Sequence, residues 1–260
     1  MQYVRPVDFA AFKPTEFHSQ RIADRSSGIE SCICICTRVP RGTCTTNGPH
    51  THSGDQFYYV TRGRMTLEID GQVSTADTGS LVFIPAGSPH WNWNDGAEEE
   101  VHFELIVPSP EAGAPISTTL AAVEKRPSTE PAPSPHVTRL DPSGFNPERF
   151  SQLTLRGRSN GSSHCRFMVA RVPPGGKSPD LHIHRFDQFY YLLTGTMQLQ
   201  IGLAEMSAGA DTLVVLPAGV PHRNWNNGAE DETHVSLQVP ENREGERADY
   251  AVRLEAIGGT

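Results

Sequence analysis

One pattern occurs twice in the chain, and this internal repeat most constrains the fold. Two sets of His, Gln, Pro, Gly and Asn recur in the same order, and each member of the second set lies 132 positions after its counterpart, as from His50 to His182. Upstream the separation is 133, as from Phe12 to Phe145, so the second copy has lost one residue in between. A repeat of this length indicates two tandem domains of one fold rather than a solenoid of short units.

Each half places three histidines and a glutamine where their side chains can converge. In a β-strand, residues of equal parity face one side, so His50, His52 and Gln56 can meet. His90 arrives from a later strand, after a turn shaped by proline and glycine. Imidazole nitrogens and an amide oxygen suit a divalent transition metal with coordination positions left for water or substrate. The predicted metal ligands are His50, His52, Gln56 and His90, and in the second half His182, His184, Gln188 and His222.

The spacing of these residues resembles the two motifs of the cupin family. The second motif, Gly-x5-Pro-x-Gly-x2-His-x3-Asn, is matched from Gly79 to Asn94 without a gap. The first, Gly-x5-His-x-His-x3,4-Glu-x6-Gly, is matched at both histidines. It departs from the pattern in the spacing of its first glycine and in Gln56, which stands where most cupins carry glutamate. The resemblance covers about residues 4–108 and 137–240.

This resemblance implies an all-β fold of two tandem cupin barrels, each a double-stranded β-helix or jelly roll. The residues point the same way, because short strands bounded by Gly, Pro, Asn or Asp recur without a convincing long amphipathic helix. In the first half we expect strands at about 31–39, 56–62, 64–70, 80–84 and 100–107. The predicted domains are an N-terminal barrel (1–108), a proline-rich linker (109–136), a C-terminal barrel (137–240) and a C-terminal tail (241–260).

Charge and composition limit the classes of partner. The net charge of −8, from 22 basic and 30 acidic residues, argues against a nucleic-acid ligand. No apolar run approaches the roughly 20 residues of a membrane span, and the N-terminus lacks the apolar stretch of a signal peptide. Cys32, Cys34 and Cys36 alternate with isoleucines, as small buried groups in a strand would. We expect a reduced, cytoplasmic protein whose partner is a small-molecule substrate, without nucleic acid or membrane, and we leave a homodimer open.

Glutamine in place of glutamate is the informative departure from the family pattern. Histidine and glutamine are neutral ligands, so a divalent metal keeps its full charge and is a stronger Lewis acid toward a carbonyl or enolate oxygen. The expected cofactor is one divalent transition metal per barrel, with Fe, Zn, Mn, Ni and Co all open. Cupins with His-x-His followed by glutamine include polyketide cyclases, an isomerase of bacilysin biosynthesis and hydroxynitrile lyases. The resemblance therefore also implies non-redox chemistry.

One tyrosine in each half is predicted to face its metal. Tyr58 shares the parity of Gln56, and Tyr190 shares the parity of Gln188. A phenol beside a metal can donate a proton or hold a substrate oxygen. The alternative is a tyrosine packed in the barrel core. Both tyrosines are therefore candidate catalytic residues.

A polar strand face supplies the other candidates. His102 and Glu104 alternate with apolar residues, and they form the best acid–base pair of the first half if their face lines the cavity. The second half keeps His234 but has Ser236 in place of Glu104. Its histidine is thus expected to lack the carboxylate that could orient it. This difference predicts that the N-terminal barrel is the catalytic one.

Three functions remain open on these grounds. We expect a metal-dependent enzyme that isomerises, cyclises, dehydrates or cleaves a small oxygenated metabolite without redox chemistry. The first alternative is an iron-dependent dioxygenase of the quercetinase-like type, which consumption of oxygen during turnover would reveal. The second is a cupin that binds a small molecule without turning it over.

Overall fold

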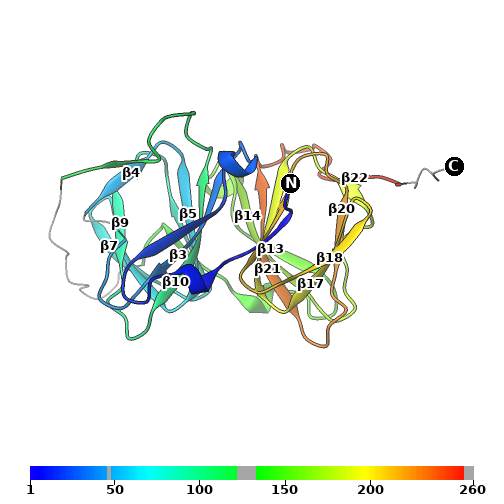
Figure 1. The fold of residues 1–260 in the computed structure, drawn as a ribbon, viewed down its shortest axis with the longest axis horizontal. Coiled ribbons are helices and arrows are strands. Elements are labelled where there is room, and N and C mark those ends of the chain that lie inside the picture. The colour runs from blue at the N-terminus through cyan, green and yellow to red at the C-terminus, as the bar shows by residue number, and fades with distance from the viewer. Residues whose placement is uncertain (46–47, 122–132, 255–260) are drawn as a thin grey trace. The chain divides into compact units, whose positions relative to one another are not determined.

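The chain folds into two compact units made almost entirely of strands (Figure 1). The computed structural model describes residues 1–45, 48–121 and 133–254. Val7–Asp141 form one unit, here called the N-terminal barrel, and Met1–Pro6 with Pro142–Thr260 form the other, the C-terminal barrel. Helical structure in the described residues is limited to the short 3-10 turns η1 (Phe9–Ala11), η2 (Arg25–Ser27), η3 (Pro142–Gly144) and η4 (Arg158–Asn160). The all-β prediction is confirmed.

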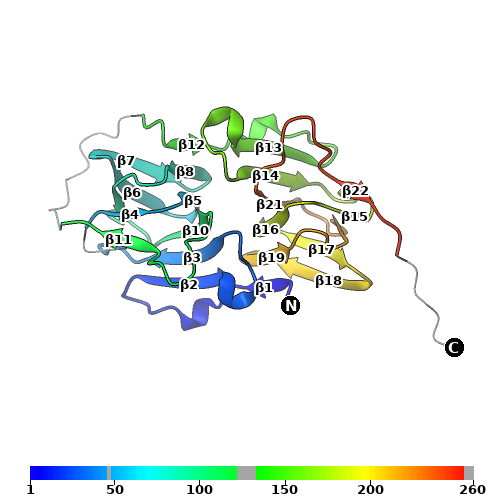
Figure 2. The same ribbon diagram turned by 90° about the horizontal axis from the view of Figure 1, so that it is seen from above.

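Two antiparallel sheets make the N-terminal barrel. Its strands are β2 (His18–Ala23), β3 (Ile33–Val39), β4 (His50–His52), β5 (Asp55–Arg62), β6 (Arg64–Ile69), β7 (Gln72–Asp77), β8 (Ser80–Ile84), β9 (His90–Trp93), β10 (Glu100–Val107), β11 (Ser117–Thr119) and β12 (Val137–Arg139). One sheet has the order β12-β8-β5-β10-β3-β2, and the other has the order β11-β4-β9-β6-β7 (Figure 2). All five strands expected from the sequence are present, within two residues at each end.

The C-terminal barrel repeats this arrangement strand for strand. Its strands are β1 (Val4–Pro6), β13 (Ser151–Arg156), β14 (Arg166–Val172), β15 (His182–Ile183), β16 (Asp187–Thr194), β17 (Thr196–Ile201), β18 (Ala204–Gly209), β19 (Thr212–Leu216), β20 (His222–Trp225), β21 (Glu232–Val239) and β22 (Tyr250–Ala251). The six-stranded sheet runs β1-β19-β16-β21-β14-β13, and the five-stranded sheet runs β18-β17-β20-β15-β22. No helix in the described part of the chain is long and apolar enough to span a membrane.

The leading strand of each repeat is exchanged. Strand β1 pairs with β19, with Val4 opposite Val214, although β1 begins the first repeat. Strand β12 pairs with β8, with Val137 opposite Val82, although it begins the second repeat. Each six-stranded sheet is therefore completed by a strand of the other repeat. The domain boundaries predicted at residues 108 and 137 do not include this exchange.

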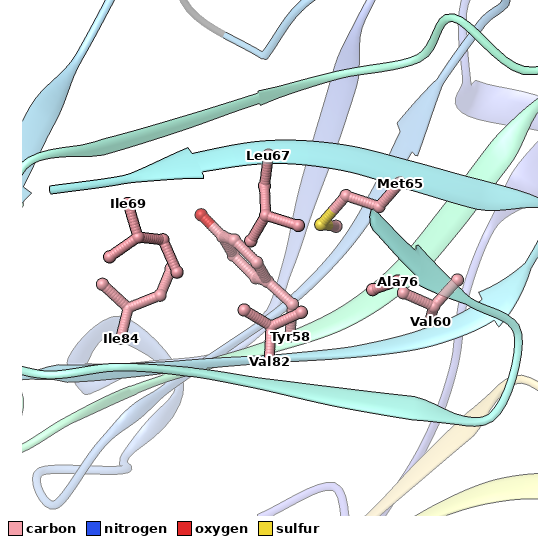
Figure 3. Packing of buried hydrophobic residues seen from close by; sticks show 8 residues of the cluster. All are labelled: Tyr58, Val60, Met65, Leu67, Ile69, Ala76, Val82 and Ile84. Atoms are coloured by element: carbon pink, nitrogen blue, oxygen red, sulfur yellow. The ribbon is translucent and has the colours of Figure 1, made fainter. Parts of the chain in front are cut away.

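The core of each barrel lies between its two sheets. In the N-terminal barrel, Met65, Leu67 and Ile69 of β6 face Val82 and Ile84 of β8, and all five are at most 2% exposed (Figure 3). Residues of one parity thus form the buried layer, as the alternation of the sequence predicts. The C-terminal core repeats the cluster with Met197, Leu199 and Ile201. Strand β5 contributes Tyr58 and Val60 to this layer, and β9 pairs with β6 beside it.

Candidate metal centres

The three predicted histidines of the first half converge in the N-terminal barrel. His50 and His52 lie at the two ends of β4, and His90 begins the neighbouring strand β9, directly opposite His50. One ring nitrogen from each lies within 4.8 Å of the others, and all three residues are buried. This spacing fits a single ion bound by three imidazoles. We call these histidines, with the predicted ligand Gln56 on β5, the first centre.

The same arrangement recurs in the C-terminal barrel. His182, His184 and His222 also bring one nitrogen each to within 4.8 Å of one another. Their ring centroids lie 4.5–5.0 Å apart, and those of the first centre lie 4.4–5.3 Å apart. With Gln188 on β16 they form the second centre. Each barrel therefore holds a three-histidine group that fits one metal ion.

The turn that carries the last histidine is fixed by hydrogen bonds to the other ligand strands. The Gly87 amide donates to the His52 carbonyl at 2.9 Å, and the Ala86 amide donates to the Asp55 carboxylate at 3.1 Å. Gly87 has a φ of 82°, which favours glycine at this point of the turn. The C-terminal barrel repeats both bonds, from Gly219 to His184 and from Ala218 to Asp187. The Pro-x-Gly spacing of the motif thus aims the histidine that follows it.

Backbone carbonyls set the tautomer of most of these histidines. His52 Nδ1 donates to the Ile116 carbonyl and His90 Nδ1 donates to the Ser88 carbonyl, both at 2.8 Å. In the second centre the corresponding acceptors are Asp180, Ala248 and Val220, at 2.7–2.9 Å from the Nδ1 atoms of His182, His184 and His222. A carbonyl can only accept, so Nδ1 carries the proton and Nε2 keeps its lone pair for a metal.

Two of these acceptors lie just before short strands that the sequence did not reveal. Ile116 precedes β11, which pairs with β4, and Ala248 precedes β22, which pairs with β15. β11 lies in the predicted linker, and β22 lies in the predicted tail. Ile116 and Ala248 are 132 positions apart, so continuing the repeat beyond residue 240 would have found them. Both segments fold back onto a histidine strand.

Truncating the chain after Pro240 is therefore expected to weaken the second centre. The deletion removes β22 and the carbonyl that holds His184. Loss of such an orienting partner lowers metal affinity by about 10–100-fold. Titration with Co(II) should show weaker binding at one site, with affinity at the first centre unchanged. Equal affinities before and after truncation would show that the carbonyl does not position His184.

Unpartnered buried atoms support the fit of a metal. In the first centre, Nε2 of His52, Nε2 of His90 and Oε1 of Gln56 are buried without a hydrogen-bond partner among the described residues. His184 Nε2 is in the same condition in the second centre. Leaving such atoms unsatisfied is costly. A cation bound by these lone pairs would satisfy them together.

Several histidines of the two centres favour the neutral form that a metal needs. Burial, together with the charge of His52, lowers the pKa of His50 to about 4. Burial and the charge of His50 lower the pKa of His90 to about 3. Burial also lowers the pKa of His222 to about 3. At neutral pH these rings lack the second proton that would compete with a cation.

The two glutamines have different surroundings. Gln56 Nε2 donates to Glu104 Oε1 at 2.5 Å, and both residues are buried. Ser236 occupies the position of Glu104 in the C-terminal barrel, where its hydroxyl has no hydrogen-bond partner among the described residues. Gln188 Oε1 instead lies 2.9 Å from His222 Nε2. The predicted asymmetry between the barrels is thus real at this position.

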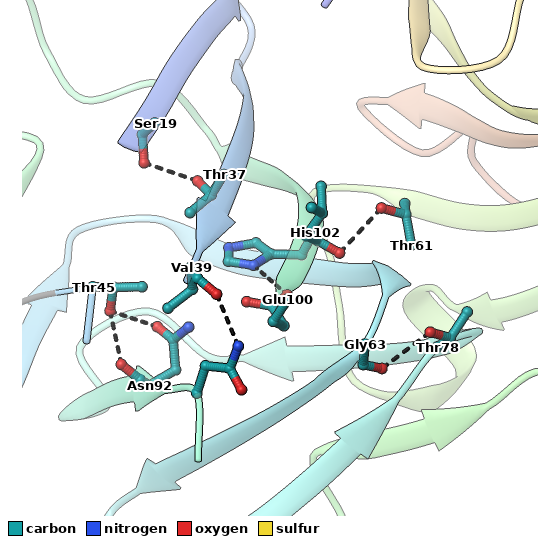
Figure 4. Close-up of polar contacts among 12 residues, drawn as sticks. Ser19, Thr37, Val39, Thr45, Thr61, Gly63, Thr78, Asn92, Glu100 and His102 are labelled. Atoms are coloured by element: carbon teal, nitrogen blue, oxygen red, sulfur yellow. Dashed lines mark hydrogen bonds and ion pairs between the residues drawn. The ribbon is translucent and has the colours of Figure 1, made fainter. Parts of the chain in front are cut away.

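The partner of His102 differs from the one expected. His102 Nδ1 lies 2.8 Å from Glu100 Oε1, and both side chains are 1% exposed (Figure 4). His234 has the same bond to Glu232, also at 2.8 Å. The expectation that His234 lacks an orienting carboxylate is therefore wrong. Burial lowers the pKa of His102, but the charge of Glu100, their hydrogen bond and the charge of Glu104 together raise it above its ordinary value.

Both predicted tyrosines face inward beside these histidines. The Tyr58 ring lies 4.7 Å from that of His102, and the Tyr190 ring lies 4.7 Å from that of His234. Burial, followed by the charge of Glu104, raises the pKa of Tyr58 well above its ordinary value. Burial, followed by the charge of Glu232, raises the pKa of Tyr190 as well, so each phenol stays protonated. Tyr58 is also part of the core cluster of Figure 3, so packing and cavity lining are both among its roles.

The two centres open into cavities of different size. The first cavity has a volume of about 400 Å³, and Gln56, Tyr58, His102 and Glu104 all line it. The second has about 150 Å³ and is lined by the corresponding Gln188, Tyr190 and His234. Sites for small ligands commonly measure roughly 300–1,000 Å³. All the predicted catalytic residues thus line a cavity beside a centre, and only the first cavity has the volume of a ligand site.

Solved structures with similar folds include several two-barrel proteins. Oxalate decarboxylase from Bacillus subtilis, whose structure is described in terms of its Mn(II) centres, matches with a TM-score of 0.65 at 15% identity, over 95% of this chain and 79% of its own. Salicylate 1,2-dioxygenase from Pseudoaminobacter salicylatoxidans matches with a TM-score of 0.66 at 12% identity, over 85% and 76%. A cupin 2 conserved barrel domain protein from Leptotrichia buccalis matches with a TM-score of 0.60 at 15% identity, over 92% and 98%. At these identities the likeness concerns the fold alone.

The sequence itself identifies the family. No curated protein matches the chain in sequence. The family model for the cupin domain, however, matches at residues 37–108 and again at 168–237, which together exceed half of the chain. Each match contains one complete three-histidine group. The chain therefore belongs to the cupin family and is a bicupin, with a three-histidine group that fits a metal in each barrel.

Proposed function

We propose that this bicupin is a metal-dependent enzyme that converts a small oxygenated metabolite without redox chemistry, by isomerisation, cyclisation, dehydration or elimination. The reaction is assigned to the N-terminal barrel. The observation that carries the proposal is the first cavity, where Glu104 and His102 lie beside a three-histidine centre in a volume of about 400 Å³. A metal bound there would supply Lewis acidity toward a substrate oxygen.

The chain's own residues supply groups for proton transfer. Glu104 accepts a hydrogen bond from Gln56 through Oε1, so its carboxylate is available as a base toward the cavity. His102 is held by Glu100, which favours the protonated ring and makes the ring a proton donor. Tyr58 keeps its proton and can hold a substrate oxygen. A base and two donors around one cavity suit enolisation or elimination.

Exchange of substrate protons with solvent tests this reaction class. A panel of small keto and hydroxy carboxylates would be incubated with metal-loaded protein in D2O without oxygen and followed by proton NMR. We expect deuterium to enter at the carbon next to the carbonyl, and Glu104→Gln to slow its entry. Turnover that requires oxygen would favour the dioxygenase alternative instead. Binding without exchange or product would favour a non-catalytic cupin.

An arginine at the cavity supports an anionic substrate. Arg21 lines the first cavity, and its side chain is 57% exposed, with Nη1 3.8 Å from the Asp24 carboxylate. Thr154 stands at the corresponding position of the second repeat, and the second cavity is lined by Asp249. Of the two cavities, only the first is therefore lined by a cationic side chain. This difference favours a carboxylate-bearing substrate in the N-terminal barrel.

Arg21→Gln is expected to raise KM for a carboxylate substrate about fivefold with little change in kcat. The expectation follows because a solvent-exposed cation contributes about 1 kcal/mol to binding, in the ground state and the transition state alike. Arg64→Gln is the matched control, since Arg64 is an exposed arginine that pairs with Asp77 and does not line the cavity. An unchanged KM in Arg21→Gln would remove the argument for an anionic substrate.

A further inference from the structure

We propose that Glu104 is a positioning residue that fixes the Gln56 amide so that its oxygen, and not its nitrogen, faces the first centre. The proposal rests on the metal centre of the proposed function but not on the proposed reaction. In this proposal Gln56 is the ligand, and Glu104 sets the orientation of its amide. The proposal also distinguishes the first centre from the second, which has the same ligand residues.

The orientation follows from the chemistry of the two groups. The amide of glutamine has one end that donates and one that accepts, and the carboxylate oxygen that it meets is the acceptor. At 2.5 Å from Glu104 Oε1, the end of Gln56 must therefore be the NH2 group. Exchanging the two ends would set two acceptors against each other in a buried site. The carboxylate thus decides which atom of Gln56 is left for a metal.

The sheet brings these two side chains together. Glu104 on β10 lies opposite Tyr58 on β5, and Gln56 lies opposite Ile106. Gln56 and Glu104 are therefore diagonal neighbours on one sheet face, a separation that long side chains can bridge. Both also line the first cavity with His50 and His52. The Gln56 oxygen, buried and without a hydrogen-bond partner in the described residues, completes the arrangement.

The C-terminal barrel is an internal comparison. Ser236 replaces Glu104 there, and the Gln188 oxygen lies 2.9 Å from His222 Nε2, a nitrogen that keeps its lone pair because Nδ1 donates to the Val220 carbonyl. No carboxylate fixes that amide within the described contacts of Gln188. A carboxylate behind a neutral ligand also makes the ligand oxygen more basic. The first centre therefore has a ligand of intermediate strength, between a free glutamine and a glutamate.

A double-mutant cycle at the first centre tests the proposal with Co(II) as the probe. The variants are Gln56→Leu, Glu104→Leu and the double variant, all made with His184→Ala so that one centre is read. Co(II) affinity and the visible absorption of the bound ion are measured, and melting curves check folding. We expect Glu104→Leu to weaken Co(II) binding by about 10–100-fold and to change the absorption. The double variant should be no weaker than Gln56→Leu alone, because both act through one ligand.

Two further variants keep the test decisive. Glu104→Gln retains an acceptor oxygen and should restore much of the affinity lost in Glu104→Leu. Glu104→Ser copies the residue of the second barrel and replaces Glu104→Leu if that variant does not fold. Additive losses in the cycle, or an unchanged affinity and spectrum on removal of the carboxylate, would overturn the proposal. Cobalt binding is read without turnover, so an inactive protein with a coupled cycle would overturn the proposed function and leave this inference standing.

Discussion

His52→Ala is expected to lower turnover about a thousandfold, while His184→Ala leaves most of it. Loss of a metal that stabilises charge in the transition state costs about 4 kcal/mol, which is about three powers of ten in rate. His52 borders the cavity of about 400 Å³ that also holds Glu104 and His102. His184 borders the cavity of about 150 Å³, where Ser236 replaces that carboxylate. The variant at the larger cavity, His52→Ala, should therefore lose far more turnover than His184→Ala.

The two variants control for each other, because the histidines occupy equivalent places in the two barrels. Each is held by one backbone carbonyl, His52 by Ile116 and His184 by Ala248. Both variants would be compared at equal folded fraction and after measurement of metal content. Loss of turnover in His184→Ala with retention in His52→Ala would assign the reaction to the other barrel.

Glu100→Leu is expected to lower the free energy of unfolding by about 3–5 kcal/mol. His102 and Glu100 are 1% exposed and joined at 2.8 Å, and removing one member of a buried ion pair leaves the other uncompensated. Glu100→Gln keeps an acceptor oxygen for His102 Nδ1, so its loss should be nearer 1–2 kcal/mol. Urea unfolding of both variants measures the difference. Equal losses in the two variants would mean that the charge of Glu100 does not stabilise the fold.

The ligand sets were predictable because their signal is local and repeated. Parity within a strand places His50, His52 and Gln56 on one face, and the spacing of the second motif brings His90 to them. Gly79, the first residue of the second motif, has a φ of 83°, a conformation that favours glycine. Asp211 takes its place in the second repeat with a φ of 57°. Such features depend on residues close together in the chain, so they can be predicted from the sequence.

The partner of His102 could not be found by parity. Glu100 and Glu104 each lie two positions from His102, on opposite sides of it in the sequence, so alternation does not distinguish the two carboxylates. The register decides between them, and β10 is irregular against β5 between Val101 and His102. Glu104 is directed to Gln56 and Glu100 to His102. Such a choice depends on side-chain directions that a period of two does not contain.

The exchanged strands and the returning segments escaped prediction for a different reason. β1, β11, β12 and β22 have only two or three residues each, too few to show a period. They are held by backbone hydrogen bonds to a neighbouring strand, which any sequence can make. The prolines between residues 108 and 135 also favoured the interpretation of a linker. Residues 122–132 of that predicted linker lie outside the described part of the chain.

The central claim is that each barrel binds one metal through its three-histidine group. Its most direct test is elemental analysis of protein purified without chelator and reconstituted with each candidate divalent metal, alongside His52→Ala and His184→Ala. Because both groups are complete, with nitrogens within 4.8 Å of one another, we predict about two ions per chain in the unaltered protein and about one in each variant. Less than one ion per chain after reconstitution, or two ions retained in both variants, would contradict the account.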